Sequence, residues 1–462
     1  MPGRTSLLPL LVATLFVPLA SVTHAVEAQK PNILIIVADD LGYADLGFQG
    51  GKGIPTPHID SIAAGGARFT NGYVSGPYCS PTRAGLLTAR YQQRFGHEFN
   101  PGGEGAGSRE GNASGLPLSE TTIANRLKEA GYVTGLVGKW HLGSGPKHHP
   151  QQRGFDEFFG FLGGAHTYFN KKEASVMRGT TQITEQEYLT DAFGREAVSF
   201  IERHQKKPFF LYLAFNAVHT PMEATNDRLA RFSSISTKSR QTYAAMLSAM
   251  DDSVGKVLGA LKAASLEENT LIFFISDNGG PTMQGTTING SINTPLRGSK
   301  RTTLEGGIRV PFLIHWKGRI PAGTVYDNPV IQLDIQPTAL AAAGVSIKPE
   351  WKFDGVNLLP YITGKSTGQP HETLYWRLGD QNAIRQGDWK LVQYDRAADN
   401  DSSRSVTAPK LYNLKDDIGE SRDLATTNPE KAAELEKAWK TWNKDLATPL
   451  WGGSRGAAKD KK

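Results

Sequence analysis

Four oxygen-bearing side chains stand in two short motifs, and each motif follows an apolar run of the sequence. Asp39 and Asp40 end the run NILIIVADD, while Asp277 and Asn278 follow NTLIFFIS. Three carboxylates and one amide offer oxygen atoms, which are the ligands preferred by hard divalent cations such as Ca²⁺ and Mg²⁺. Each motif alone is also typical of an ordinary turn after a strand. Together, the two motifs predict a cation site.

Five basic side chains are candidates for holding an anion beside that cation. Taken singly, each is more commonly a surface or capping residue. As a group next to a divalent metal, they suit a tetrahedral oxyanion such as sulfate or phosphate, because they neutralise its charge. The group consists of Arg83, Lys139, His141, His219 and Lys300.

Cys79 is the only cysteine among the 462 residues of the chain. The segment SPTRAGLLTAR after it predicts a helix that begins near Pro81. Cys79 would then lie at a helix N-terminus, where backbone N–H groups favour an anion. A lone cysteine is most often a buried apolar residue. A thiolate beside three carboxylates would be repelled, and no Cys-His-Asn pattern accompanies it, so ordinary cysteine hydrolysis fits poorly.

The elements that would position these residues alternate between apolar strands and amphipathic helices. Continuous apolar runs are typical of strands buried on both faces, and the alternation predicts a mostly parallel sheet sandwiched between helices. Such sheets bind ligands at the carboxyl ends of their strands. The candidate residues follow strands at that end, so we expect them to converge. The segments that contain these strands are 32–40, 133–143, 208–221, 269–280 and 310–316, and helices are expected at 56–66, 118–132 with Ser119 as cap, and 239–264.

The sequence pattern changes near residue 364, from alternating strands and helices to short alternating segments, and this change predicts a second, smaller unit. Short alternating segments separated by Gly-Asp turns predict a small antiparallel sheet, and a helix follows near 429–445. The expected division is a signal peptide at 1–28, a catalytic domain at 29–366, a C-terminal antiparallel α+β subdomain at 367–450 and a basic tail at 451–462.

The first 28 residues predict export. Arg4 precedes an apolar run from Leu7 to about Ala20, and small residues continue to Ala25 or Ala28, as in a cleaved secretory signal peptide. A membrane anchor is the alternative, but this run is short for a span and contains two prolines. We therefore expect a periplasmic or secreted protein with no stable membrane anchor.

The charge of the chain argues against one class of partner. The net charge is +6, from 51 basic and 45 acidic residues. No concentrated basic stripe with interleaved aromatic residues accompanies it, so nucleic-acid binding is not expected.

The segment CSPTR matches the Cys/Ser-x-Pro-x-Arg signature of the type I sulfatases, which belong to the alkaline phosphatase-like superfamily. The resemblance runs in order through essentially the whole mature chain. The other matching segments are IIVADDLGYADLG, GYVTGLVGKWHLG, FLYLAFNAVHTP, FFISDNGG and LRGSKRTTLEGGIRVP. The chain thus resembles a formylglycine-dependent sulfatase with an alkaline phosphatase-like fold.

This resemblance implies that a maturation enzyme converts Cys79 to formylglycine. The hydrated aldehyde would attack sulfur, form a covalent sulfo-enzyme and then expel sulfate. The resemblance also implies a bound Ca²⁺, with Mg²⁺ the less expected ion. The implied ligands are Asp39, Asp40, Asp277, Asn278 and the modified residue 79.

The resemblance also implies a role for each remaining site residue. Arg83 and Lys139 would hold the charge of the nucleophile and sulfate, and Asp277 would accept the attacking proton. His219, with Lys300, would protonate the leaving alcohol, while His141 would act as base in sulfate release. Lys139, His219 and Lys300 would also bind the substrate.

The expected substrate is a sulfated polysaccharide or oligosaccharide. Its sugar would contact the loops 92–115 and 163–172, with Arg94, His97 and His166 as candidate contacts. Two alternatives stay open. One is a phosphodiesterase or phosphonate monoester hydrolase on the same scaffold, and the other is a non-catalytic protein that binds sulfated glycans.

Overall fold

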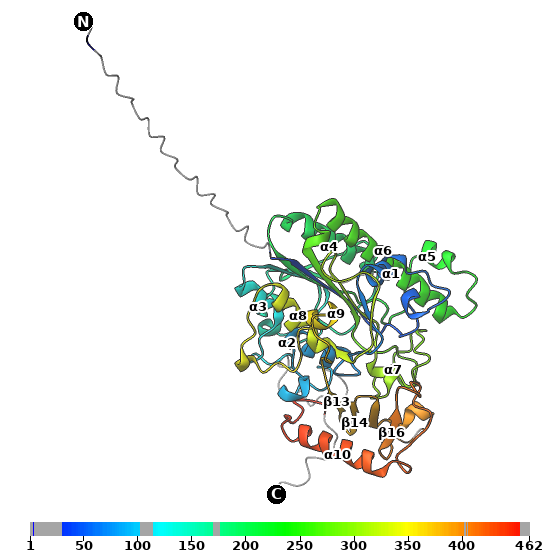
Figure 1. Cartoon of the computed structure of the whole chain (residues 1–462). Helices are drawn as coiled ribbons and strands as arrows, with labels where there is room; N and C mark the ends of the chain where they lie inside the picture. Colours follow the sequence, from blue (N-terminus) through cyan, green and yellow to red (C-terminus); the bar gives the residue numbers. More distant parts are fainter. Residues whose placement is uncertain are drawn as a thin grey trace.

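The computed structural model describes residues 30–101, 114–169, 176–401 and 405–452, together with Gly3 and Ser403. The predicted signal peptide, apart from Gly3, and the basic tail after Gly452 lie outside these residues. The last strands and the last helix gather at one end of the molecule, at the bottom of Figure 1.

A ten-stranded sheet forms the centre of the larger part of the chain. Its five middle strands, β9, β1, β8, β4 and β5, are mutually parallel, whereas β10 and β6 pair antiparallel at their flanks. The predicted mostly parallel sheet is therefore confirmed. The order is β11 (Thr324–Tyr326), β2 (Ala67–Phe69), β10 (Phe312–His315), β9 (Thr270–Ser276), β1 (Asn32–Ala38), β8 (Phe209–Ala214), β4 (Val133–Lys139), β5 (Glu157–Phe161), β6 (Val176–Arg178) and β7 (Thr181–Ile183).

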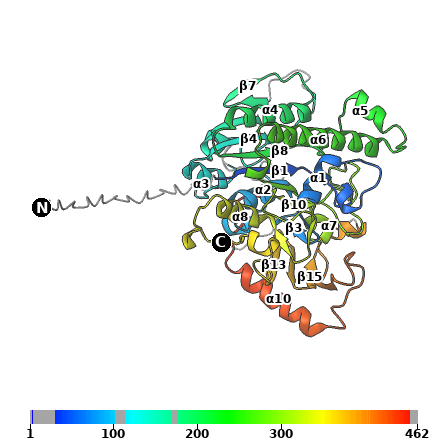
Figure 2. The same cartoon turned by 45° about the horizontal axis from the view of Figure 1, so that its top comes forward.

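Helices cover both faces of this sheet, with α4 and α6 on one side of the central strands and α2 and α8 on the other (Figure 2). Among the described residues, no helix is both long enough and apolar enough to cross a membrane. The helices are α1 (Pro57–Gly65), α2 (Cys79–Thr88), α3 (Ile123–Glu129), α4 (Leu189–His204), α5 (Asn226–Arg231), α6 (Lys238–Ala263), α7 (Glu305–Ile308), α8 (Ile335–Ala342), α9 (Leu359–Ile362) and α10 (Pro429–Asn443).

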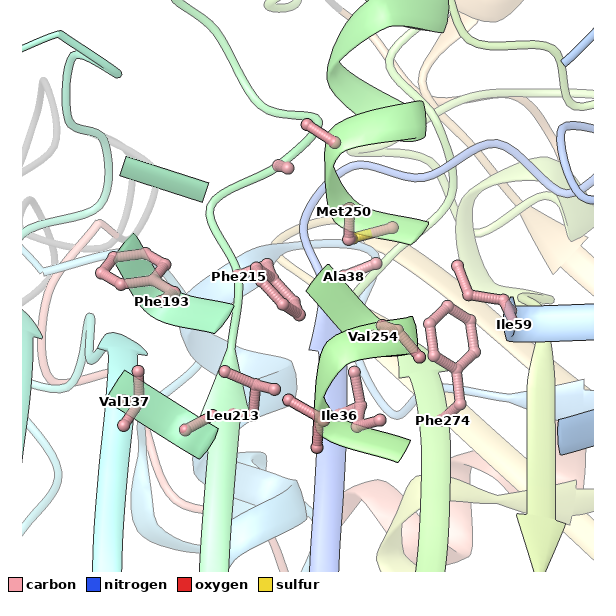
Figure 3. Packing of buried hydrophobic residues seen from close by; sticks show 14 of the residues in the cluster. Ile36, Ala38, Ile59, Val137, Phe193, Leu213, Phe215, Met250, Val254 and Phe274 are labelled. Atoms are coloured by element: carbon pink, nitrogen blue, oxygen red, sulfur yellow. The ribbon is translucent and has the colours of Figure 1, made fainter. Parts of the chain in front are cut away.

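Strand β1 explains why an unbroken apolar run is required at the centre. Successive side chains of a strand point to opposite faces, and both faces are buried here. Leu34 and Ile36 join the cluster under α4 and α6, while Ile33 and Ile35 join the cluster under α2, α3 and α8. Figure 3 shows Ile36 in the first cluster, with Met250 and Val254 of α6 above the strands.

One predicted helix begins later than expected. The sequence predicts a helix over 118–132 with Ser119 as its cap, but α3 starts at Ile123 and its cap is Thr122. The Thr122 hydroxyl accepts from the Asn125 backbone N–H at 3.2 Å, and the Asn125 side chain accepts from the Thr122 N–H at 3.1 Å. This reciprocal pair satisfies N–H groups of the first turn, which places the helix start at Ile123.

The C-terminal part forms the antiparallel sheet that the sequence predicts. The strands pair in sequence order, and α10 lies against β14 and β15. A separate two-stranded sheet pairs β3 (Gly72–Tyr73) with β12 (Val330–Ile331). The four antiparallel strands are β13 (Thr373–Leu378), β14 (Gln381–Gln386), β15 (Trp389–Gln393) and β16 (Lys410–Asn413).

A buried ion cluster joins this small sheet to the larger part of the chain. Lys390 of β15 places its Nζ atom 2.8 Å from Glu305 Oε1 and 2.8 Å from Glu420 Oε1, and all three residues are fully buried. Glu305 begins α7, only five residues after Lys300. The small sheet therefore fixes the segment that carries one of the predicted site residues.

We expect Lys390→Met to destabilise the protein strongly, because it leaves two buried carboxylates without their shared cation. Breaking a buried ion pair from one side costs about 3–5 kcal/mol of the free energy of unfolding. Urea denaturation of both variants measures this, with Lys437→Met on the exposed face of α10 as the matched control. Equal midpoints for the two variants would contradict the role of the cluster.

Candidate active site

Four neighbouring strands of the large sheet deliver polar residues to one edge. Asp277 follows β9, Asp39 and Asp40 follow β1, His219 lies five residues beyond β8, and Lys139 ends β4. Since these four strands are parallel and adjacent, their carboxyl ends meet. The convergence expected from the sequence is present in the structure.

The acidic residues form a compact group around which a cation could bind. Ligand atoms of four side chains lie within 4.8 Å of one another, and all four are buried. Asp277 approaches the same point, since its Oδ1 accepts from the Asp40 backbone N–H at 3.3 Å. The four side chains are Asp39, Asp40, Cys79 and His219.

Asn278 adds an available ligand to this group. Its Nδ2 donates to Asp40 Oδ1 at 2.7 Å, whereas its buried Oδ1 has no hydrogen-bond partner among the described residues. A buried carbonyl oxygen without a partner is costly. A hard cation would satisfy this oxygen and the neighbouring carboxylates, so the side chains present fit such an ion.

Each of the three site carboxylates lies closest to a different buried lysine or arginine. The charges of these six side chains therefore cancel. The pairs are Lys139 with Asp39 at 2.6 Å, Lys300 with Asp40 at 2.8 Å and Arg83 with Asp277 at 2.8 Å.

The pKa values show how closely the charges are packed. Burial opposes ionisation of Asp40, but Lys300 and His219 outweigh it and lower the pKa to about 2. Burial raises the pKa of Asp277 to about 6, and the charge of Asp39 adds to this effect. A divalent cation would relieve the repulsion between the carboxylates.

Cys79 is the first residue of α2 and lies at a pocket of about 460 Å³. Its Sγ is 3.6 Å from Asp39 Oδ1, and its side chain is almost fully buried. Burial raises the pKa of the Cys79 thiol well above its usual range; Lys139 and Lys300 oppose this rise, and nearby carboxylates add to it. The thiol is therefore neutral and a poor nucleophile.

Both predicted site histidines line this pocket, and both are neutral near pH 7. Burial lowers the pKa of His219 to about 4, and its Nδ1 lies 2.6 Å from Thr220 O, so that nitrogen carries the proton. Burial and then the Lys139 charge hold the pKa of His141 well below its ordinary value.

Comparison with known proteins identifies the family. A family model described as Sulfatase matches residues 31–345, which is more than half of the chain. The chain belongs to the sulfatase family. It is a type I sulfatase of the alkaline phosphatase-like superfamily, which confirms the resemblance seen in its motifs. A second model, described as N-sulphoglucosamine sulphohydrolase, C-terminal, matches residues 298–445.

Relatives and solved structures agree with this assignment. The sulfatase is 37% identical to N-acetylgalactosamine-6-sulfatase of Canis lupus familiaris over 381 residues, covering 78% of this chain and 71% of the relative. It is 33% identical to arylsulfatase G of Rattus norvegicus, covering 90% and 87%. The crystal structure of Ps i-CgsB in complex with k-i-k-neocarrahexaose superposes with a TM-score of 0.83 at 38% identity, covering 92% and 96%.

The candidate sugar contacts differ in how near they lie to the pocket of the sulfatase. Arg94 is not among the lining residues, and its guanidinium holds both carboxylate oxygens of Asp354 at 2.7 to 3.0 Å. His166 is half-buried and follows Gly164 and Ala165, which do line the pocket.

The expected sugar contact at His97 is wrong. His97 is fully buried, and its Nε2 lies 2.7 Å from Ser80 Oγ, which in turn donates to His141 O at 2.6 Å. The single Ser80 hydroxyl proton is used on that carbonyl, so His97 Nε2 must be the donor to Ser80. Both residues thus support the backbone of His141 instead of contacting a sugar.

Asn289 is a site residue that the sequence does not reveal. Its buried Nδ2 donates to the backbone carbonyls of Asp40 at 3.1 Å and Val218 at 2.9 Å. It therefore links the loop after β1, which carries Asp40, to the loop that carries His219. In the sequence it stands only in a glycine-rich loop without periodicity, so no pattern points to it.

We expect Asn289→Ala to reduce both stability and kcat/KM, because two buried carbonyls lose their donor. The expected cost is about 1–3 kcal/mol. Thermal unfolding with and without added divalent cation is the measurement, with the exposed Asn328→Ala as control. A cation-induced rise in Tm equal to that of the wild type would show that Asn289 does not position Asp40.

Proposed function

We propose that this sulfatase is an exported enzyme that removes sulfate from sulfated oligosaccharides or polysaccharides, with formylglycine at position 79 and Ca²⁺ as its cofactors. The observation that carries the proposal is the placement of Cys79. Its thiol lies at the pocket, 3.6 Å from Asp39 and near the charges of Lys139 and Lys300, yet it is too weakly acidic to react as a thiolate.

Conversion of Cys79 would resolve this contradiction. The hydrated aldehyde of formylglycine would supply an oxygen nucleophile in place of the thiol. Asp277, whose pKa is raised to about 6, is suited to accept a proton near neutral pH. Arg83, fixed against Asp277 by two hydrogen bonds at 2.8 and 3.0 Å, keeps that carboxylate oriented.

The oxygen ligands favour Ca²⁺ over Mg²⁺. Mg²⁺ requires strict octahedral geometry and retains several waters, while Ca²⁺ accepts six to eight oxygens in irregular arrangements. A fully buried set of carboxylates and an amide from two loops suits the second case. The cation would supply positive charge beside the nucleophile and leave Lys139 and Lys300 to neutralise the sulfate. The ligands would be Asp39, Asp40, Asp277 and Asn278, with residue 79 beside them.

Proton transfer to and from the substrate would fall to the two histidines. His219 is neutral in the absence of substrate, but a bound sulfate ester adds negative charge nearby and raises its pKa, which favours the donor form. Lys300, whose pKa is raised by Asp40 against the effect of burial, stays charged and holds the ester oxygen. The lowered pKa of His141 keeps its ring unprotonated near neutral pH, which is the form that can accept a proton.

The substrate class and export rest on separate support. The relatives include a sulfatase named for N-acetylgalactosamine and a structure in complex with k-i-k-neocarrahexaose, which supports a glycan substrate. The N-terminal sequence has the features of a cleaved signal peptide, which supports a periplasmic or secreted enzyme.

Conversion of Cys79 gives the most direct test. Protein produced with a formylglycine-generating enzyme should show an aldehyde in the peptide that contains residue 79 and should hydrolyse 4-nitrophenyl sulfate. Cys79→Ala should lower kcat by about 10⁴-fold or more, since it removes the nucleophile. Full activity of protein that retains cysteine would refute the proposed nucleophile, and faster cleavage of 4-nitrophenyl phosphate would favour the alternative hydrolase.

Cation binding is testable without turnover. Free Ca²⁺ at 100 times its Kd should stabilise the folded protein by about 2.7 kcal/mol. Thermal unfolding after chelation, then with Ca²⁺ or Mg²⁺ restored, measures the effect, and Asp40→Asn should abolish most of it. A larger rise in Tm with Mg²⁺ would overturn the choice of ion.

A further inference from the structure

We propose that Arg301 selects substrates that carry a second anionic group, a sulfate or a carboxylate, close to the sulfate ester that is cleaved. This inference rests on the proposed function and adds to it a specificity residue and a narrower substrate class. Three independent observations support it: the charges of the pocket, the backbone of Arg301 and the position of its side chain.

Two positively charged side chains line the pocket, and only one of them has a counter-ion among the described residues. Of the described residues that line it, Lys300 and Arg301 are the charged ones. Lys300 lies 2.8 Å from Asp40 and is neutralised there. The Arg301 guanidinium has no carboxylate within ion-pair distance in the described part of the chain, and its Nη1 donates only to Gly285 O, at 3.2 Å. The guanidinium therefore retains donors for an anion from solution.

The backbone of Arg301 is held in a conformation that does not suit a side chain. Its φ of 73° lies in the left-handed region, which costs free energy for residues other than glycine. Its N–H donates to Pro77 O at 2.7 Å, and its carbonyl accepts from Gln381 Nε2 of β14 at 2.9 Å. Hydrogen bonds from the larger part of the chain and from the C-terminal sheet thus fix the backbone of Arg301 beside Lys300.

The position of Arg301 suits a group adjacent to the scissile ester. It follows Lys300 directly and lines the same pocket as Cys79, but it is exposed where Lys300 is buried. A guanidinium presents parallel N–H donors that match the oxygens of a sulfate or carboxylate. The scissile sulfate would occupy the inner position, and the second anion would lie at the rim.

The test compares three substrates with the matured, cation-loaded enzyme. All share one sulfated monosaccharide: the first carries the single sulfate, the second carries an additional sulfate on the same sugar, and the third is linked to a uronic acid. The variants are Arg301→Gln, Arg301→Lys and Arg301→Gly, the last of which accepts the left-handed backbone. Arg319→Gln, an exposed arginine in a different pocket, is the matched control.

We expect Arg301→Gln and Arg301→Gly to lower the ratio of kcat/KM for a doubly anionic substrate to that for the singly sulfated one by about 10- to 100-fold. The loss should lie mainly in KM, Arg301→Lys should recover part of it, and Arg319→Gln should leave the ratio unchanged. A loss confined to the second or to the third substrate identifies the second anion as sulfate or carboxylate.

An unchanged ratio in both Arg301→Gln and Arg301→Gly would overturn the inference and leave Arg301 as a structural support of the Gly285 loop. An equal preference of the wild type for all three substrates would overturn it as well. Failure of the proposed function is distinguishable, because the matured wild type would then hydrolyse neither 4-nitrophenyl sulfate nor any of the three sugars.

Discussion

The burial of three carboxylates at one edge of the sheet is the constraint on which the rest of the site depends. Like charges in a dry environment repel and are poorly solvated, and the raised pKa of Asp277 records this. Each carboxylate is matched by a buried cation from another element. The same pairing prepares the site for a doubly charged ion, because the ion would neutralise the carboxylates and leave the matching cations for an anionic substrate.

The C-terminal sheet is part of this charge arrangement and not an appendage. It contacts the segment 300–305 at three points: Gln381 donates to Arg301 O at 2.9 Å, Gln393 O accepts from Thr303 at 3.0 Å, and Lys390 binds Glu305 at 2.8 Å. This segment carries Lys300, which neutralises Asp40. A short loop rich in glycine could not hold a buried ammonium alone, since the ordering of its backbone costs free energy. The second unit supplies the contacts that offset this cost.

The sequence predicted the parts of the structure that are governed by local patterns. A continuous apolar run such as β1 indicates a strand buried on both faces, and parallel neighbours force the residues after each strand together, so the convergence of Asp39 and Asp277 followed. Contacts made across the chain were not predictable. His97 contacts Ser80 because the chain turns back after α2, and Asn289 lies in a loop without periodicity. Nothing local distinguishes such a buried hydrogen-bonding residue from one that faces solvent, which is why His97 was misread.

One recurring backbone arrangement connects the separate parts of the site. Asp40, His141 and Arg301 are non-glycine residues with left-handed φ values of 60°, 59° and 73°, and each lies at the pocket or the cation group. In each case the carbonyl of that residue accepts a hydrogen bond from a side chain that is distant in sequence. Strained backbone persists where surrounding contacts fix it, so these donors fix the backbone from which the three side chains project. The three pairs are Asn289 with Asp40 at 3.1 Å, Ser80 with His141 at 2.6 Å and Gln381 with Arg301 at 2.9 Å.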